Sequence, residues 1–462
     1  MKMKRLFAVV LLSVGAAQAS DPTVHPYQLD NGLKLIVKED HRAPVVVSQV
    51  WYKVGSSYEH EGITGISHVL EHMMFKGTKK HGPGEFSRII AENGGQENAF
   101  TSRDYTAYFQ RLEQSRLPVS FELEADRMRN LLLQEDEFVK EVQVVMEERR
   151  LRTEDKPESL LFERFNAVAF INSPSRIPPI GWMTDLESLR LDDLAQWYAT
   201  WYAPNNATLV VAGDVDPDEV LKLAKRFFGP LKPSEIRPEK PRREVPQRGT
   251  RRGMLRAPAE VAYVLLGYKA PVLLTAGEGE DWEPYALEVL AGVLDGGDSA
   301  RLTRELVRGQ QIAASAGAGY DLYDRRETLL LFDGVPAKGH TVAELEVALR
   351  EQVRRLREEP VSAAELERVK AQVIASQVFE QDSVFYQAMQ IGQLESIGLD
   401  WSLKDAYLKR IQAISSEQVQ AVARKYLFED ALTVGILEPL PMDAAATAAM
   451  RRAEALGGGH GH

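Results

Sequence analysis

The chain has 462 residues, which is too many for one compact hydrophobic core, so we expect at least two domains. Hydrophobic residues make up 44% and charged residues 27%, as in ordinary globular proteins, and the formal net charge of −11 argues against nucleic acid as the main partner. There is no cysteine, which excludes a disulfide framework and a lipid-attachment cysteine.

The first 19 residues have the pattern of a cleaved export signal. Met1 to Arg5 is basic, Leu6 to Val14 is apolar, and Ala17-Gln18-Ala19 is a small-residue cleavage site. The apolar run is too short to span a bilayer, so we expect no transmembrane segment in the mature chain. We therefore predict a periplasmic protein that begins at Ser20.

The next part of the chain alternates strand patterns with long helical patterns. We expect residues 28–39 to pair as a strand with residues 45–54 through the connection at 41–44. The later elements expected are a helix at 84–92, a strand pair at 96–101 and 106–110, helices at 117–133, 135–152 and 191–202, and a buried strand at 207–213. This order predicts α+β domains, with helices packed on a mostly antiparallel sheet.

A stretch rich in Pro, Lys, Arg and Glu divides the mature chain. We interpret residues 231–257 as a linker between a domain at 20–230 and a second domain at 258–445. Residues 446–462 form a tail that ends in Gly-Gly-Gly-His-Gly-His, which we interpret as a dispensable flexible end.

The second half of the chain repeats the first in outline. A helix pattern and the strand after it recur at one constant offset, from Leu194 to Val419 and from Thr208 to Thr433 (419 − 194 = 225 and 433 − 208 = 225). A duplicated domain is the simplest explanation, so we expect two homologous domains.

The stretch at 62–78 contains the pattern H-x-x-E-H. On a helix, His68, Glu71 and His72 lie on one side and the apolar residues lie on the opposite side. Two imidazoles one turn apart can hold the same metal ion, and the carboxylate between them lies beside it. An ordinary amphipathic helix with two histidines on its polar face is the alternative. The corresponding helix of the second half, expected from Trp282 to Leu294, has no histidine.

The helix expected at 135–152 is the richest source of acids for a third ligand. With its apolar residues toward the core, Glu141 and Glu148 fall on one flank and Glu147 points away. We interpret Glu148 as the third ligand and Glu141, one heptad earlier, as a carboxylate that orients a histidine or Glu148. From the helical angles alone, a solvated surface charge would be the simpler explanation of either residue.

The spacing of these residues carries a family resemblance. Glu148 follows His72 after 75 intervening residues (148 − 72 − 1 = 75), within Val-Val-Met-Glu-Glu-Arg. Other segments that match are His72-Met-Met-Phe-Lys-Gly-Thr78, Asn98-Ala-Phe-Thr-Ser-Arg-Asp104, Tyr202-Ala-Pro-Asn-Asn-Ala-Thr-Leu-Val-Val-Ala-Gly-Asp214 and Gly296-Gly-Asp-Ser-Ala-Arg-Leu302. Over nearly its whole mature length, the chain resembles the pitrilysin or insulinase family of zinc peptidases, which includes the mitochondrial processing peptidases.

The resemblance implies a fold, a cofactor and a reaction. It implies two homologous α+β domains that form half of a clam-shell around unfolded peptides. It also implies one zinc ion per chain, bound by His68, His72 and Glu148, with Glu71 as the general base of a metalloendopeptidase.

The family also binds its substrate along an exposed strand. In the family this edge strand pairs with the peptide backbone. It corresponds to residues 97–101 here, so Asn98, Ala99 and Phe100 are candidate substrate contacts, although they could also be ordinary strand residues.

One expected feature of the family is missing from the second half. Members that work alone, or the partners of those that do not, carry an Arg and a Tyr seven residues apart that reach the site. The matching positions here are Val307 and Ala314, and a shift by one residue gives Arg308 but places Ser315 at the Tyr position. We therefore expect a heterodimer with a homologous metal-free subunit that supplies the pair. Tyr320 or Tyr323 as a substitute, and a homodimer, are alternatives.

Two other functions are compatible with the same family. The chain could be a non-catalytic structural or assembly subunit, or a peptide-binding chaperone of the same fold. The intact set His68, Glu71, His72 and Glu148 favours the peptidase, since a structural subunit needs no general base.

Overall fold

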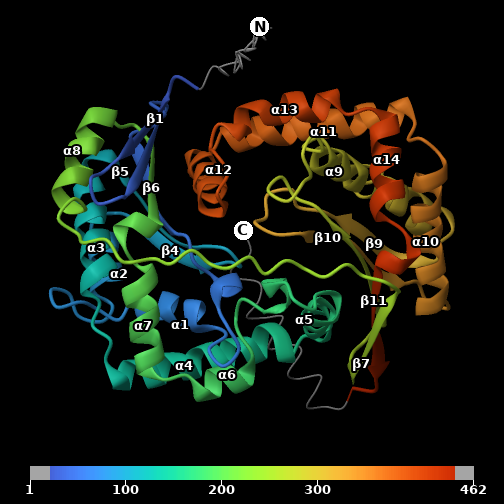
Figure 1. Cartoon of the computed structure of the whole chain (residues 1–462), viewed down its shortest axis with the longest axis horizontal. Coiled ribbons are helices and arrows are strands. Elements are labelled where there is room, and N and C mark those ends of the chain that lie inside the picture. Colours follow the sequence, from blue (N-terminus) through green and yellow to red (C-terminus); the bar gives the residue numbers. More distant parts are fainter. Residues whose placement is uncertain (1–20, 443–462) are drawn as a thin grey trace, which may run out of the picture.

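The computed structural model describes residues 21–442, which form two halves that face each other (Figure 1). The predicted export signal at 1–19 and the predicted tail with its two histidines, His460 and His462, lie outside the described residues. Within residues 21–442, no helix is both long and apolar enough to cross a membrane.

The first half is a six-stranded sheet with helices. Its strands are β1 (Val24–Gln28), β2 (Lys34–Glu39), β3 (Val45–Tyr52), β4 (Gln96–Thr101), β5 (Thr106–Glu113) and β6 (Ala207–Gly213). Its helices are α1 (Ile66–Met73), α2 (Glu85–Glu92), α3 (Leu117–Asn130), α4 (Glu135–Arg149), α5 (Pro157–Ala169), α6 (Met183–Ser188), α7 (Leu191–Trp201) and α8 (Pro217–Phe227). The strand order is β1-β2-β6-β3-β5-β4, and β2–β6 is the parallel pair in an otherwise antiparallel sheet.

The predicted pairing of residues 28–39 with residues 45–54 is wrong. Strand β6 lies between β2 and β3, and β2 instead forms a hairpin with β1. The connection at 41–44 passes over the end of β6, where the N–H of Asp40 donates to the Gly213 carbonyl at 2.8 Å. Because β6 is buried along its whole length, each of its edges needs a strand beside it, and a short connection between β2 and β3 does not prevent this.

The second half is a five-stranded sheet with helices. Its strands are β7 (Arg251–Pro258), β8 (Tyr263–Ala270), β9 (Ala313–Gly319), β10 (Thr328–Pro336) and β11 (Leu432–Leu440). Its helices are α9 (Glu283–Leu294), α10 (Val342–Glu358), α11 (Ala363–Gln381), α12 (Val384–Ile397), α13 (Leu403–Ala413) and α14 (Ser416–Tyr426). The strand order is β7-β11-β8-β10-β9.

Part of the predicted linker is a strand. Residues 251–257 belong to β7, which pairs in parallel with β11 at the edge of the second sheet. Its Leu255 and Ala257 are buried, whereas the side chains of Arg252 and Arg256 are exposed. An edge strand with few large apolar residues has the composition of a linker, which explains the wrong prediction.

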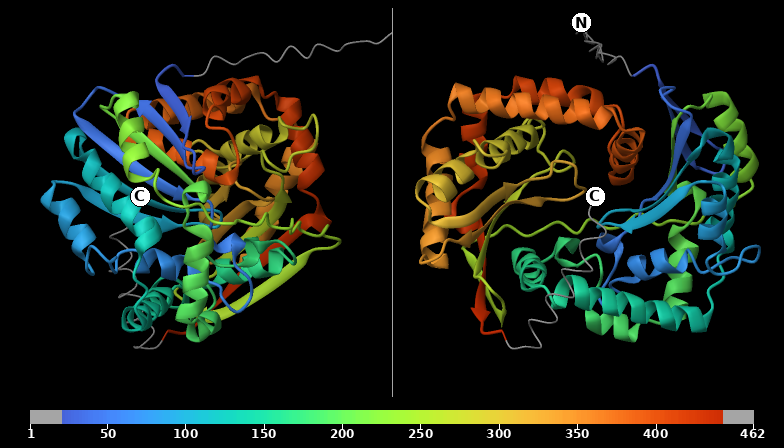
Figure 2. Two further views of the ribbon diagram at one scale, coloured as in Figure 1. Left: turned by 60° about the vertical axis from the view of Figure 1, so that its left-hand side comes forward. Right: turned by 180° about the vertical axis from the view of Figure 1, so that it is seen from behind.

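The predicted duplication and fold class are confirmed. In each half an inner strand of the sheet follows a helix after the same number of residues: β6 follows α7, and β11 follows α14. Both strands pair in parallel with an early strand of their own half, β6 with β2 and β11 with β7. The second sheet therefore reproduces the order of the first without the counterpart of β1. Figure 2 shows the two sheets and their surrounding helices from two further sides.

The two halves exchange one helix each. Helix α12 belongs to the second half of the chain but packs on strands β3 and β6 of the first sheet, and α5 of the first half packs on β7 and β11 of the second sheet. Figure 1 shows α12 and α5 on these opposite sides. Each exchanged helix covers the face of the other half's sheet that is not covered by that sheet's own helices. Each half therefore completes the packing of the other.

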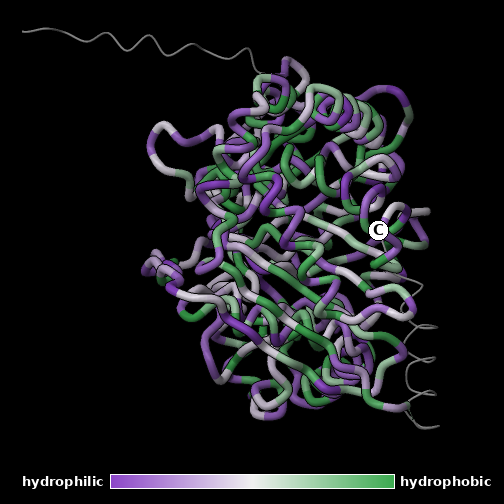
Figure 3. Tube along the Cα trace, turned by 90° about the vertical axis from the view of Figure 1, so that its right-hand side faces the viewer, coloured by the Kyte–Doolittle hydropathy of each residue, from purple (hydrophilic) through white to green (hydrophobic). Residues whose placement is uncertain are grey.

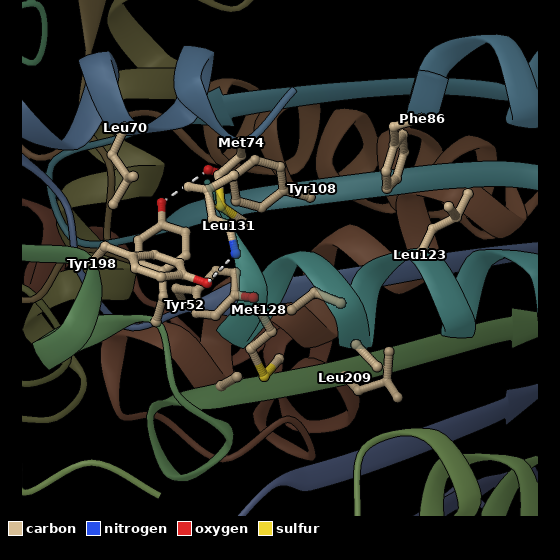
Figure 4. Packing of buried hydrophobic residues seen from close by; sticks show 14 of the residues in the cluster. Tyr52, Leu70, Met74, Phe86, Tyr108, Leu123, Met128, Leu131, Tyr198 and Leu209 are labelled. Atoms are coloured by element: carbon tan, nitrogen blue, oxygen red, sulfur yellow. Dashed lines mark hydrogen bonds between the residues drawn. The ribbon is translucent and has the colours of Figure 1, made fainter. Parts of the chain in front are cut away.

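Each sheet packs its other face against its own helices around a separate hydrophobic core. In Figure 3 hydrophobic residues run along the strands that cross the middle of the view, and hydrophilic residues occupy many peripheral loops. In the first core Leu70, which lies within the H-x-x-E-H pattern, and Met74, which follows it, lie beside Tyr108 and Tyr198 (Figure 4). This packing ties the candidate metal helix to the sheet.

Candidate metal centre

Helix α1 carries the H-x-x-E-H residues, and distant carboxylates hold its N-terminus. Glu59 is buried and accepts hydrogen bonds from the N–H groups of Gly65 at 2.7 Å and Ser67 at 2.9 Å. Asp185 accepts from the N–H and hydroxyl of Thr64. The helix has no capping side chain of its own because Gly65 precedes it with φ 88°, a conformation that favours glycine.

Three of the predicted residues converge at one point. Nε2 of His68 lies 3.7 Å from Oε1 of Glu148, and Nε2 of His72 lies 3.5 Å from Oε2 of Glu148. One ligand atom from each of the three residues lies within 4.8 Å of the others. Two ligand atoms about 2.1 Å from one tetrahedral ion lie about 3.4 Å apart, so the residues fit a single ion such as zinc.

The proton positions on the histidines suit a metal between them. Nδ1 of His72 faces Oε2 of Glu141 at 3.2 Å, so Nδ1 carries the proton and Nε2 is left to face Glu148. Lys76 holds the other oxygen of Glu141 at 2.6 Å. Nδ1 of His68 is buried and has no hydrogen-bond partner among the described residues.

The electrostatics of the cluster favour a cation. Burial and then the neighbouring His72 lower the pKa of His68 to about 4, so His68 is neutral and free to act as a ligand. Burial opposes a charge on His72 as well, but its hydrogen bonds with Glu141 and Glu148 raise its pKa to about 9. The carboxylates around His72 thus stabilise a positive charge in this place, which a metal ion also supplies.

Glu71 lies close enough to the cluster to interact with His72 and Glu148. Its Oε2 accepts a hydrogen bond from the Thr101 hydroxyl at 2.5 Å, which orients the carboxyl from strand β4. Burial raises the pKa of the Glu71 carboxyl above its ordinary value, and the Thr101 hydrogen bond opposes that rise. A higher pKa makes this carboxyl a better acceptor for a proton than an ordinary glutamate.

A cavity of about 570 Å³ adjoins the cluster and separates it from the second half. His68, Thr101 and Glu148 line it from the first half, and Tyr263 and Asp333 line it from the second. Arg152 also lines it and contacts Glu148 at 2.6 Å. The cavity is wide enough for several residues of an extended peptide.

The predicted substrate strand is an edge strand. Strand β4 is the last strand of the first sheet and has β5 on one side. Asn98 is exposed, whereas Ala99 packs against the first core, and Phe100 packs edge-on against Trp51 with ring centroids 5.6 Å apart. The unpaired backbone edge of β4 is therefore the accessible feature, more than the side chains of Ala99 and Phe100.

None of the positions considered for the missing Arg and Tyr pair lines the cavity next to the cluster. Val307 packs against the core of the second half, and Ala314 is exposed on edge strand β9. Arg308 pairs with Asp298 at 2.8 Å. Tyr320 and Tyr323 pack against the second core and do not line the cavity next to the cluster.

Sequence reasoning missed the supports of the site: Glu59, Lys76, Thr101 and Asp185. Each lies outside the H-x-x-E-H pattern or on another element, and none has a periodicity that marks it. The one usable signal was the place of Thr101 at the end of the predicted substrate strand.

Comparisons with known sequence families match both halves. Residues 34–180 match the family described as "Insulinase (Peptidase family M16)", and residues 188–373 match the "Peptidase M16 inactive domain". A curated relative, the zinc protease PqqE of Helicobacter pylori, is 36% identical over 374 residues, which cover 79% of this chain and 82% of the relative.

Solved structures show the same fold. A protease from Helicobacter pylori superposes with a TM-score of 0.85 at 31% identity, over 90% of this chain and all (100%) of that chain. The periplasmic protease PqqL from Escherichia coli has a TM-score of 0.78 at 20% identity, and the match covers 95% of this chain but 51% of PqqL. At that identity the second likeness shows the fold alone.

Proposed function

The chain belongs to the insulinase family of peptidases, peptidase family M16, and on this premise we propose that it is a zinc-dependent endopeptidase. The observation that carries the proposal is the convergence of His68, His72 and Glu148 on one point, with Glu71 beside it. The family description and the names of the relatives support a peptidase, and the proposal adds the metal, the catalytic role of Glu71 and the kind of substrate.

The residues divide the reaction between them. His68, His72 and Glu148 would hold a zinc ion, which would supply the Lewis acidity that activates water and polarises a peptide carbonyl. Glu71 takes the proton of the attacking water and passes it to the nitrogen of the leaving amine. Thr101 holds the Glu71 carboxyl in place, and Glu141 holds His72 with its Nε2 toward Glu148.

The proposed substrates are peptides and unfolded segments of proteins. Strand β4 has a free edge that an extended peptide can join by backbone hydrogen bonds. Backbone pairing makes little demand on sequence, and Asn98, Ala99 and Phe100 provide the strand for it. A folded protein has few segments extended enough to pair in this way.

We place the enzyme in the periplasm and expect it to work with a partner. The export signal expected at residues 1–19 supports the location. The partner in this proposal is a homologous subunit without the metal motif, which supplies an Arg and a Tyr, and a homodimer is the alternative. The matched part is only 51% of PqqL, so that chain has room for a second unit of this size, which supports the idea of two such units working together.

The test uses an unfolded protein and a fluorogenic peptide as substrates. We expect the wild type with its partner subunit to hydrolyse both substrates, to lose this activity after chelation and to regain it with zinc. Glu71→Gln should retain one zinc per chain and lose about 100- to 10,000-fold in rate. Retained activity in Glu71→Gln would refute the assigned mechanism, and full activity of the purified chain without any partner would refute the heterodimer.

The main rival is a non-catalytic subunit; the "inactive domain" match concerns the second half alone, whereas the first half matches the peptidase family. This rival predicts zinc binding without turnover, even after the homologous partner subunit has been added. A peptide-binding chaperone would bind peptides tightly and hydrolyse them slowly, at a rate that does not change when the partner is added.

A further inference from the structure

Arg103 is a cation at the metal cavity without an ionic partner. It lies two residues after Thr101 and lines the same cavity as His68 and Glu148. Within residues 21–442 its guanidinium forms no hydrogen bond or ion pair, and its Nε atom is buried and unpartnered. A charge held partly out of water without a partner is unfavourable, so such a group is a candidate ligand site.

The backbone that carries Arg103 is held firmly. The N–H of Ser57 donates to the Arg103 carbonyl at 2.8 Å, and the Ser57 hydroxyl donates to Asp104 at 2.5 Å. Glycine is required at position 55 because a Cβ there would lie 2.3 Å from the Ser102 carbonyl oxygen. Arg103 is therefore presented to the cavity from a fixed turn, as a binding residue must be.

The other cations of the cavity lining already have partners. Arg152 pairs with Glu148 at 2.6 Å, and Arg176 pairs with Glu61. Among the arginines that line the cavity in the described part of the chain, Arg103 therefore remains available to a ligand.

Acidic groups near Arg103 do not neutralise it by contact. Arg103 opposes the rise that burial causes in the pKa of Asp321 and of Asp324, yet neither carboxylate forms an ion pair with it. Glu158 also lines the cavity, so a peptide rich in carboxylates would be repelled as well as attracted. The arrangement suits one carboxylate placed at Arg103.

We propose that Arg103 binds one carboxylate of the substrate near the bond that is cut, and so selects peptides with an acidic side chain or a free carboxyl terminus at one position. Guanidinium binds carboxylate through two parallel hydrogen bonds, a geometry that a backbone carbonyl cannot match. Arg103 is thus a specificity residue, and the inference rests on the proposed peptidase function.

The test compares matched peptides. A peptide that the wild type cleaves, with its cut site mapped by mass spectrometry and both ends blocked, receives Glu or Gln at each of the six positions around the cut. A second pair differs only in a free or an amidated carboxyl terminus beyond the cut. We expect one position, or the free terminus, to raise kcat/KM by about ten- to a hundredfold.

Substitutions then assign that preference. Arg103→Gln should remove it, and Arg103→Glu should replace it with a preference for Lys over Gln at the same position. Arg176→Gln removes an equal charge from the same cavity, from a residue that has its own partner, and should keep the preference. Thermal unfolding checks that the variants fold, and the reversal by Arg103→Glu is a result that misfolding cannot produce.

A binding measurement separates this inference from the proposed function. Fluorescence anisotropy with labelled peptides on Glu71→Gln, and on Glu71→Gln combined with Arg103→Gln, needs no hydrolysis. We expect the first variant to bind the Glu peptide about tenfold more tightly than the Gln peptide and the second to bind both equally. An absence of any preference for a carboxylate in both kinds of peptide pair, or its survival without Arg103, overturns the inference, whereas an absence of hydrolysis by the wild type with its partner subunit overturns only the peptidase.

Discussion

The two halves share one strand order, but the helix beside the edge strand differs in chemistry. In the first half α1 lies against β4 and presents His68, Glu71 and His72 on its free side. In the second half α9 lies against β9, and every residue of α9 is buried except Glu288 and Gly292. The fold by itself therefore does not create the candidate metal site, which depends on a polar helix face that α1 has and α9 lacks.

The halves also fill their exchanged contacts in opposite ways. On the first sheet the large residue is Trp51 of β3, and the helix above it has Gly392, where a Cβ would lie 2.1 Å from the Trp51 ring. On the second sheet the large residue is Phe165 of α5, and the sheet below it has Gly267 and Gly435, where a Cβ would lie 2.8 Å from the Phe165 ring.

The register of the strands makes this reversal specific. Trp51 pairs with Thr208 of β6, and Gly267 pairs with Thr433 of β11, so Trp51 and Gly267 occupy the same place in the two sheets. Gly392 and Phe165 are each the ninth residue of their helices. A large residue therefore lies on the sheet in one half and on the helix in the other, which makes each helix fit one sheet only.

The largest expected effect tests the chemical difference between the two halves, through the carboxylate that α4 brings to the histidines of α1. Glu148→Gln should weaken zinc binding at least a hundredfold and remove hydrolysis, because it deletes the charged ligand that joins the two histidines. The same substitution at Glu288, which contacts Tyr407 within the second half, should leave zinc content unchanged. Metal analysis after dialysis, together with a hydrolysis rate, measures both, and loss of zinc in Glu288→Gln would contradict the assignment of the site to the first half.

The next effect tests the exchanged helices. Phe165→Ala should lower the free energy of unfolding by about 3–5 kcal/mol, since it empties the space beneath α5. Gly392→Ala should lower it by about 1–3 kcal/mol through a clash with Trp51. Urea unfolding followed by tryptophan fluorescence gives both values.

A matched control for these variants is Phe379→Ala on α11, where the side chain is 75% exposed. It should change the free energy of unfolding by less than about 0.5 kcal/mol. If Phe379→Ala and Phe165→Ala lowered the free energy of unfolding equally, α5 would not hold the halves together.

The smallest effect concerns the seam between the halves. Arg326 of the second half donates to Asp104 at 2.8 Å and to the Ser57 hydroxyl at 2.7 Å, and Asp324 lies beside Asp104. Burial, and then the Asp104 carboxylate, raise the pKa of Asp324 to about 7 against the opposing charge of Arg103.

This raised pKa predicts a pH dependence of stability. Since the pKa of Asp324 is higher in the folded than in the unfolded chain, its contribution is present below about pH 4 and is lost as pH rises to about 7. Asp324→Asn has no carboxyl to titrate and so avoids this loss of stability. As pH rises from 4 to 7, the free energy of unfolding of the variant should therefore increase by about 1–2 kcal/mol relative to that of the wild type. Unfolding free energies over this range measure it. Asp298→Asn, with its side chain 81% exposed, is the control, and an equal gain there would contradict the prediction.

Much of the site could be predicted because its signals are local. The H-x-x-E-H pattern, the apolar face opposite it and the flank shared by Glu141 and Glu148 all follow from helix periodicity. The support of Glu71 by Thr101 could not be predicted, because it depends on β4 lying beside α1. The free guanidinium of Arg103 was also invisible, since a lone arginine in a turn has no periodicity.

The sequence by itself determined the two halves, the helix that carries His68 and His72, and the absence of those ligands from the second copy. It could do so because a helical period, a repeat offset and a residue type are properties of neighbouring positions. Only the tertiary structure decided that β6 lies between β2 and β3, that residues 251–257 form a strand, and that α5 and α12 exchange sheets. Those choices depend on contacts between residues far apart in the chain, where burial and shape, and not local pattern, select the neighbour.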